Sequence, residues 1–124
     1  LNNLFNRNLV VKMNWIPLTS LEQLTSIKDL SAAKPQIVLK HSTRCSISVM
    51  ALARLERATN VPTADFYLLD LLSYRNISNA IASEFKVSHE SPQILLIKNG
   101  DCVYDESHSG ISMDEIEEQV LQAN

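Results

Sequence analysis

Glycine and cysteine are both scarce in this sequence, with two residues of each among 124. Two cysteines cannot build the disulfide framework of a small secreted domain, and a chain of this length does not need one. We therefore expect a reducing compartment, with the cytoplasm as the default, and each cysteine needs its own explanation. The absence of repeats and low-complexity stretches favours one compact domain.

Strong net charge and long apolar runs are also missing. The formal net charge is -3, which leaves no basic footprint for nucleic acid or for an anionic membrane surface. No apolar run approaches the roughly 20 residues that a membrane-spanning helix needs. The apolar share of 45% is still enough for a hydrophobic core. We therefore expect a folded domain that has neither nucleic acid nor a membrane as its partner.

The first residues of the chain fall outside the patterned part of the sequence, which begins at Met13. The apolar stretch within residues 1–12 is too short for a secretory signal peptide. We take Met13 as the native start, and we predict an ill-ordered extension over residues 1–12 and a single domain over residues 13–124.

Alternating strand and helix patterns predict an α/β fold. Trp15–Leu18 is a short apolar stretch, which Pro17 restricts to an edge strand. Ser20 and Gln23 fit a capping box at the start of a helix that should fade near Ala33. The next four elements are predicted to be a strand, a helix, a strand and a helix, over residues 36–41, 46–58, 65–72 and about 74–86.

The last third of the chain predicts a hairpin and a terminal helix. Pro92 precedes an apolar strand over residues 94–97, and Asn99-Gly100 is the strongest short pattern for a tight hairpin turn. The more polar strand over residues 102–105 is expected at a sheet edge. A second capping box, Ser112-x-x-Glu115, opens the terminal helix.

Helical spacing predicts which side chains of these helices face the core. In the helix over residues 46–58 we expect an inward stripe of Ile47, Met50, Ala51, Leu55 and Ala58. In the two later helices we expect inward Ile77, Ala80, Ile81 and Phe85, and then Met113, Ile116 and Val120.

This order of elements predicts a thioredoxin-like fold, which is a mixed sheet with helices on both faces. Helical crossovers join the strands that precede the hairpin, so we expect those strands to be parallel. The hairpin then adds an antiparallel edge.

Cys45 lies between the strand over residues 36–41 and the start of the following helix. The first N–H groups of a helix have no internal partner, and the helix dipole places partial positive charge there. Both effects stabilise a thiolate, which is the reactive form of cysteine. His41 and Arg44 are candidates for adding positive charge, but we favour a solvent-facing position for each. Arg44 in that position is able to recruit the carboxylates of a small thiol.

A serine occupies the place of the second cysteine of a C-x-x-C pair, in the segment Cys45-Ser46-Ile47-Ser48. Ser48 is one helical turn from Cys45, so we expect its hydroxyl to donate a hydrogen bond to the thiolate. A hydroxyl cannot attack a disulfide as a second thiol would, and the segment therefore predicts monothiol exchange. From this turn alone, a buried structural cysteine is an equally good interpretation.

A proline far along the chain favours the reactive interpretation of Cys45. In the predicted fold, Ser91-Pro92 leads into the strand over residues 94–97 beside the cysteine. We expect a cis peptide bond there, which would expose the backbone of Ser91 to an extended substrate segment. An ordinary trans proline is the alternative, since only about 5–6% of X-Pro bonds are cis.

Three other residues are candidates for the chemistry of this site. We favour a structural, half-buried position on the edge strand for Cys102, with a resolving thiol as the alternative. His89 and Glu90 are adjacent to Ser91, and we favour a plain loop role over a place at the rim of the site. The cysteines and histidines are too scattered for a standard zinc spacing, so no metal site is predicted.

Three segments carry a resemblance to a known family: Trp15-Ile16-Pro17-Leu18, KHSTRCSIS around Cys45, and SPQILLIKNG after it. In this order and spacing they resemble the monothiol bacilliredoxins, the bacillithiol-system proteins of the YtxJ family. The resemblance implies a thioredoxin-like fold and the removal of bacillithiol from S-bacillithiolated client proteins. It also implies that Cys45 is the nucleophile, that Pro92 is the cis-proline, and that Ser48 replaces the second cysteine of dithiol relatives.

On this resemblance the catalytic residues are Cys45 and Ser48, and Arg44, Ser91 and Pro92 bind the substrate. No cofactor is expected to be bound, and bacillithiol acts as a co-substrate. The family often has proline directly after the cysteine, where this chain has a serine. Two other functions remain open, a redox-inactive binding or stress protein of the same fold, and a glutaredoxin-like protein that uses glutathione or holds a cluster.

Overall fold

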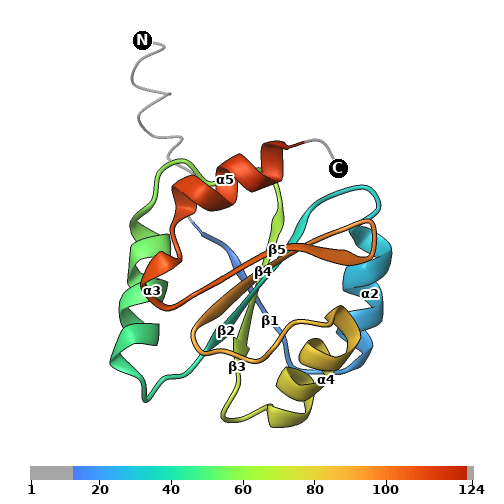
Figure 1. Ribbon diagram of the computed structural model, residues 1–124, viewed down its shortest axis with the longest axis horizontal. Coiled ribbons are helices and arrows are strands. Elements are labelled where there is room, and N and C mark those ends of the chain that lie inside the picture. The colour runs from blue at the N-terminus through green and yellow to red at the C-terminus, as the bar shows by residue number, and fades with distance from the viewer. Residues whose placement is uncertain (1–12, 123–124) are drawn as a thin grey trace.

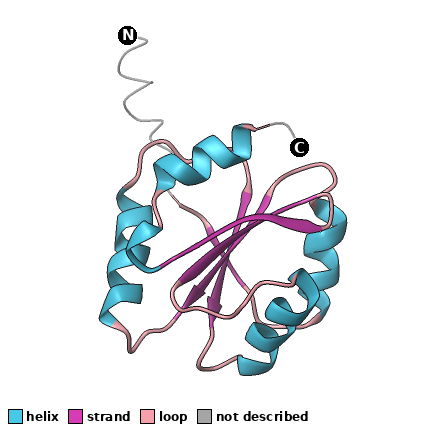
Figure 2. Cartoon of the chain, viewed as in Figure 1, coloured by secondary structure: helices cyan, strands magenta, loops and turns pink. Residues whose placement is uncertain are grey.

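A five-stranded mixed sheet with helices on both faces makes up residues 13–122, the part of the chain that the computed structural model describes (Figure 1). The prediction of an ill-ordered extension over residues 1–12 lies outside these residues. Figure 2 shows the same view coloured by element type. In chain order the elements are β1 (Trp15–Pro17), α2 (Glu22–Leu30), β2 (Gln36–His41), α3 (Ser46–Arg57), β3 (Asp65–Asp70), α4 (Arg75–Phe85), β4 (Gln93–Lys98), β5 (Asp101–Ser107), the short 3-10 helix η1 (His108–Gly110) and α5 (Met113–Leu121).

The strands lie in the order β1-β3-β2-β4-β5. β1 and β2 run parallel to β3, whereas β4 is antiparallel to β2 and β5 is antiparallel to β4. The expectation of parallel strands up to the hairpin is therefore wrong for β4. After β3 the chain passes through α4 and residues 86–92, which return it to the same edge of the sheet. A crossover to a parallel strand must instead end at the opposite edge.

Alternation along the strands divides the core into two clusters, one on each face of the sheet. Ile37 and Leu39 of β2 pack with Leu55 of α3 in one cluster, to which α5 also contributes. Val38 packs in the other cluster, with side chains of α2 and α4. Figure 1 shows this division, with α3 on the left and α5 at the top, and with α2 and α4 on the right. Among residues 13–122, no helix is long and apolar enough to cross a membrane.

The hairpin and the last helix form as their sequences predict. Asn99 and Gly100 both have positive φ, 51° and 82°, as the tight turn between β4 and β5 requires. The Ser112 hydroxyl accepts a hydrogen bond from the Glu115 N–H at 3.2 Å and so caps α5. The first capping box is present in part, because Gln23 Oε1 accepts the Ser20 N–H but the residue before α2 makes no side-chain cap.

The buried face of α3 differs from the predicted one. Ile47 and Met50 were expected inside but are 47% and 62% exposed, whereas Ser48 is fully buried. The buried stripe runs through Ser48, Ala51 and Leu55, and the sequence pattern misses it because its first member is polar. The inward faces of the later helices agree with the prediction, with Ala80 and Val120 partly buried and the other named residues buried.

Substitutions on the two sides of α3 should therefore have unequal effects. Leu55→Ala removes a fully buried side chain and should lower the free energy of unfolding by about 2–5 kcal/mol. Met50→Ala should change it by less than about 0.5 kcal/mol, because Met50 is exposed. Urea denaturation of both variants measures the two values, and equal losses would contradict the observed orientation of α3.

Candidate active site

Cys45 is the N-cap residue of α3, in the turn that follows β2. Its N–H donates to the Ser42 carbonyl at 3.3 Å, and its own carbonyl accepts the Val49 N–H at 3.0 Å, which is the first hydrogen bond of the helix. The thiol is not in a disulfide and its side chain is partly exposed. It is therefore accessible at the end of α3 where the helix dipole favours an anion.

Ser48 lies under this turn, but its hydroxyl is engaged with β2 and not with the thiol. Ser48 Oγ accepts the backbone N–H of Ser42 at 2.9 Å and lies 2.6 Å from His41 Nδ1. No hydrogen bond joins Ser48 to Cys45 within residues 13–122, so the expected donation to the thiolate is not found. A neutral His41 with its proton on Nε2 satisfies this arrangement, because its Nδ1 then accepts the Ser48 O–H.

His41 is buried, which corrects the prediction that it faces solvent. It is the last residue of β2, and its side chain points to the α3 face of the sheet, where it meets Ser48. Burial lowers the pKa of His41 below its usual value, and the carboxylates of Asp70 and Glu56 oppose this shift in part. A neutral His41 at pH 7 adds no positive charge to the site, so it does not play the charge role considered for it.

The Ser91–Pro92 peptide bond is cis, and strand pairing brings it to the edge of the sheet where α3 begins. Gln93, the first residue of β4, pairs with Lys40 near the end of β2, so Pro92 lies beside His41. Pro92 is buried and Ser91 is half-buried. The Ser91 Oγ is itself buried and has no hydrogen-bond partner in the described part of the chain.

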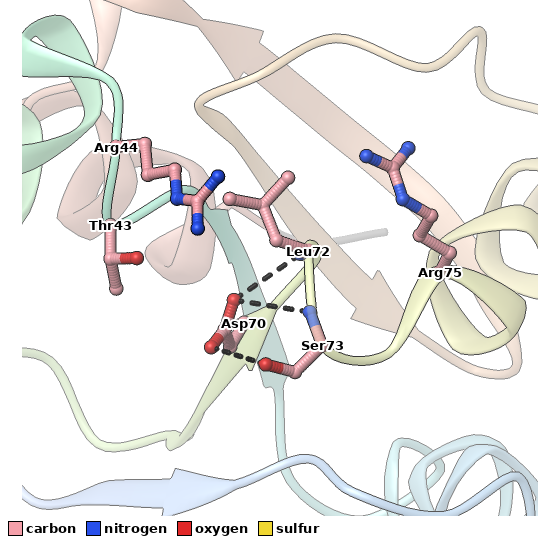
Figure 3. A pocket seen from close by; sticks show the side chains of 6 residues that line it. All are labelled: Thr43, Arg44, Asp70, Leu72, Ser73 and Arg75. Carbon is pink, nitrogen blue, oxygen red and sulfur yellow. Dashed lines mark hydrogen bonds between the residues drawn. The ribbon is translucent and has the colours of Figure 1, made fainter.

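Arg44 is exposed, as predicted, and lines a cavity of about 330 Å³ at the same edge of the sheet. Arg75, the first residue of α4, lines it from the other side, together with Thr43, Leu72, Ser73 and Asp70 (Figure 3). The two guanidinium groups lie on opposite sides of the Leu72 side chain in this view.

Sequence reasoning identified Arg44 but missed Arg75 and Asp70. Their place follows from the parallel pairing of β2 and β3, in which His41 is opposite Asp70. Residues that follow two parallel strands meet at one edge of the sheet. The parallel order of β2 and β3 would therefore have placed Asp70 and Arg75 near Arg44.

A second cavity, of about 310 Å³, adjoins the first, and Thr43 and Asp70 line both. Its other walls are mainly apolar and come from β1 and β3, including Trp15, Pro17 and Leu68. The Trp15 ring packs edge-on against Phe66 at a centroid distance of 5.9 Å. Trp15 is thus both an anchor of the edge strand, as expected, and part of a cavity wall.

Lys40 is a buried charge that the sequence did not reveal. It has no exposed surface, and its Nζ lies 3.3 Å from His89 Nδ1 on the α4 side of the sheet. Burial lowers the pKa of both groups, and the positive charge of Lys40 lowers that of His89 further. His89 therefore contacts a strand residue and is more than a plain loop position. Glu90 lies 3.5 Å from His108 and not at the cysteine.

Cys102 is remote from Cys45 and chemically unlike it. It pairs with Ile97, and the four residue steps from Gln93 to Ile97 along β4 span about 13 Å. A disulfide needs Cα atoms within about 7 Å. Burial also raises the pKa of the Cys102 thiol to about 11, and its Sγ donates to the Tyr104 carbonyl at 3.3 Å. The structural interpretation of Cys102 agrees with these features. Residues 13–122 contain no cluster of histidine, cysteine and acidic side chains that fits a metal ion.

The sheet order and the partly exposed cysteine at the start of α3 define the class of protein, a thioredoxin-fold protein with a free thiol at the N-terminus of that helix. The family model described as monothiol bacilliredoxin BrxC matches residues 16–116. The chain therefore belongs to the monothiol bacilliredoxin family. Family and fold together make it a thiol oxidoreductase of the thioredoxin type.

Solved structures agree with this assignment. A candidate oxidoreductase with a thioredoxin fold is 31% identical, with a TM-score of 0.70 over 86% of this chain and 93% of the other. Thioredoxin O2 from Arabidopsis thaliana is 19% identical, with a TM-score of 0.66 over 90% of this chain and 100% of the other. Malassezia sympodialis thioredoxin is 17% identical, with a TM-score of 0.65 over 89% and 91% of the two chains. The last two support the fold alone.

Removal of the Ser48 hydroxyl should destabilise the protein. Ser48→Ala leaves the buried Ser42 N–H and His41 Nδ1 without a partner, which should lower the free energy of unfolding by about 1–3 kcal/mol. Ser46→Ala, an exposed serine in the same helix, is the matched control and should have little effect. A Ser48→Ala protein as stable as Ser46→Ala in urea denaturation would show that these hydrogen bonds contribute nothing.

Stability should fall on mild acidification because His41 must be protonated in a buried site. Its pKa is lowered in the folded state, so below about pH 6.5 the unfolded chain binds more protons than the folded one. The free energy of unfolding should therefore decrease from pH 7.5 to pH 5.5. His41→Asn should reduce this slope, whereas His108→Asn, at an exposed position, should keep it. An unchanged slope in His41→Asn would contradict this origin of the pH dependence.

Proposed function

We propose that this protein removes bacillithiol from S-bacillithiolated client proteins by monothiol exchange at Cys45. The observation that carries the proposal is the pairing of an accessible thiol at the start of α3 with a fully buried serine, Ser48, one turn later. The first provides a nucleophile, and the second excludes an intramolecular disulfide at this turn. Membership of the monothiol bacilliredoxin family supports bacillithiol as the co-substrate.

The exchange takes place in two balanced steps. The Cys45 thiolate attacks the bacillithiol sulfur of the mixed disulfide, so that a bond forms from Cys45 to that sulfur and the bond to the client sulfur breaks. The client sulfur leaves as a thiolate and takes a proton from water. A second bacillithiol thiolate then attacks the bacillithiol sulfur of the mixed disulfide on Cys45; the new S–S bond forms oxidised bacillithiol disulfide, and the bond to Cys45 breaks and restores the Cys45 thiolate. The client sulfur therefore leaves with the electron pair of the broken S–S bond, and one further bacillithiol, which becomes part of the oxidised bacillithiol disulfide, is the reductant.

The surroundings of Cys45 have distinct roles in this proposal. The N-terminus of α3 stabilises the thiolate that attacks and later leaves. Ser91 and Pro92 lie at the same edge of the sheet and contact the extended segment of the client. Ser48 acts as a positioning residue, because it holds the turn through Ser42 and does not touch the thiol. We place the reaction in a reducing compartment, the cytoplasm, where thiols of this kind remain free.

Cysteine substitutions should separate the two thiols of the chain. Cys45→Ser should abolish removal of bacillithiol from a single-cysteine model client, because the nucleophile is lost. Cys102→Ser should keep the single-turnover rate within about twofold, since that thiol is half-buried, remote and protonated. The measurement is the rate of appearance of the free client thiol in a single turnover with excess protein.

Each variant is also checked for folding by urea denaturation, so that a loss of activity caused by unfolding is recognised. Activity retained by folded Cys45→Ser would overturn the proposal. Activity lost in folded Cys102→Ser would overturn the monothiol mechanism and make Cys102 a resolving thiol.

A further inference from the structure

The cavity beside Cys45 carries more positive than negative charge, although the chain as a whole has a formal net charge of -3. Two arginine side chains line it, from the turn before α3 and from the first residue of α4, and one carboxylate, Asp70, lies between them (Figure 3). Within residues 13–122 neither guanidinium group takes part in an ion pair. The helix dipole of α4 adds partial positive charge at the Arg75 end.

Asp70 is already satisfied by the turn that follows β3. Its carboxylate accepts hydrogen bonds from the N–H groups of Leu72 and Ser73 at 3.2 and 3.4 Å, and from the Ser73 hydroxyl at 2.9 Å. These bonds give the carboxylate a structural task, which is to hold the loop that carries Arg75. The guanidinium donors of Arg44 and Arg75 therefore remain available to a ligand.

We propose that this cavity binds the carboxylates of the small thiol that Cys45 removes, with Arg44 and Arg75 as the specificity-determining residues. This inference rests on the proposed exchange at Cys45. It adds that the protein selects small thiols by their carboxylates. A guanidinium group binds a carboxylate through two parallel hydrogen bonds, which a neutral cap cannot accept in the same way.

The dimensions fit a cap of this kind. Arg44 is adjacent to Cys45 in the chain, so their Cα atoms are about 3.8 Å apart. A tripeptide-sized thiol spans about 10 Å when extended, so a cap on the Cys45 sulfur is longer than the step from Cys45 to the neighbouring Arg44. The cavity volume of about 330 Å³ is in the range of small-molecule sites. The cavity therefore has room for the small thiol but not for the client protein.

The test compares two caps that have the same peptide and the same sulfur but differ in charge, one with free carboxylates and one with both carboxylates esterified. A single-cysteine model client is capped with glutathione or with glutathione diethyl ester, in which both carboxylates are masked. The ratio of the two single-turnover rates is measured for the wild-type protein, for Arg75→Gln and for Arg57→Gln. Arg57 is the matched control, because it is an exposed arginine in the last turn of α3, at the opposite end of that helix from Cys45.

The wild-type protein should remove glutathione about tenfold faster than its diester, which is the effect of one charge-assisted hydrogen bond. Arg75→Gln should reduce this ratio towards one, and Arg57→Gln should leave it unchanged. Added salt should reduce the wild-type ratio as well, because it screens the guanidinium groups. Arg75 is exposed, so its substitution does not disturb the core.

Two outcomes would overturn the inference: a wild-type ratio near one, or the same ratio in Arg75→Gln as in the wild-type protein. Neither would affect the proposed function, which is judged by removal of bacillithiol in the Cys45→Ser comparison. A decrease of this rate ratio in Arg57→Gln as large as in Arg75→Gln would also contradict the inference, because the effect would then come from the overall charge of the protein and not from this cavity.

Discussion

The buried Ser48 hydroxyl joins α3 to the end of β2, and the position of the Cys45 thiol depends on it. Its oxygen accepts the Ser42 N–H and meets His41 Nδ1, so the two residues that precede the turn are both held to Ser48, in the first turn of α3. Cys45 lies between these contacts and has little freedom to move relative to α3. A second cysteine at position 48 would make this a dithiol site, whereas serine makes the same position an inert support.

The direction of β4 decides what surrounds that thiol. Because β4 runs antiparallel to β2, its first residue pairs with Lys40 and the preceding Ser91–Pro92 segment reaches the edge where α3 begins. The parallel pairing of β2 with β3 brings the loop with Arg75 to the same edge. Three segments that are far apart in the sequence therefore meet at the edge of the sheet where Cys45 lies. Cys102, at the other end of β4, is excluded from this chemistry.

Local sequence patterns predicted the elements, the hairpin and the cysteine at the helix start, because each depends on a few adjacent residues. They did not predict the direction of β4, which depends on the path of residues 86–92 after α4. They also misplaced Ile47, Met50 and His41, because apolar spacing cannot show that a serine and a histidine satisfy each other inside the core. Arg75 and Asp70 were missed because only the order of strands in the sheet brings them to Arg44.

In the proposed reaction one thiol, Cys45, accepts the small thiol from the client. The most direct measurement is mass spectrometry of the protein and its client after a single turnover quenched with acid, followed by peptide mapping. One cap per protein, located on Cys45, together with an equal amount of free client thiol, is the predicted result. A disulfide between Cys45 and the client, or a cap located on Cys102, would contradict it.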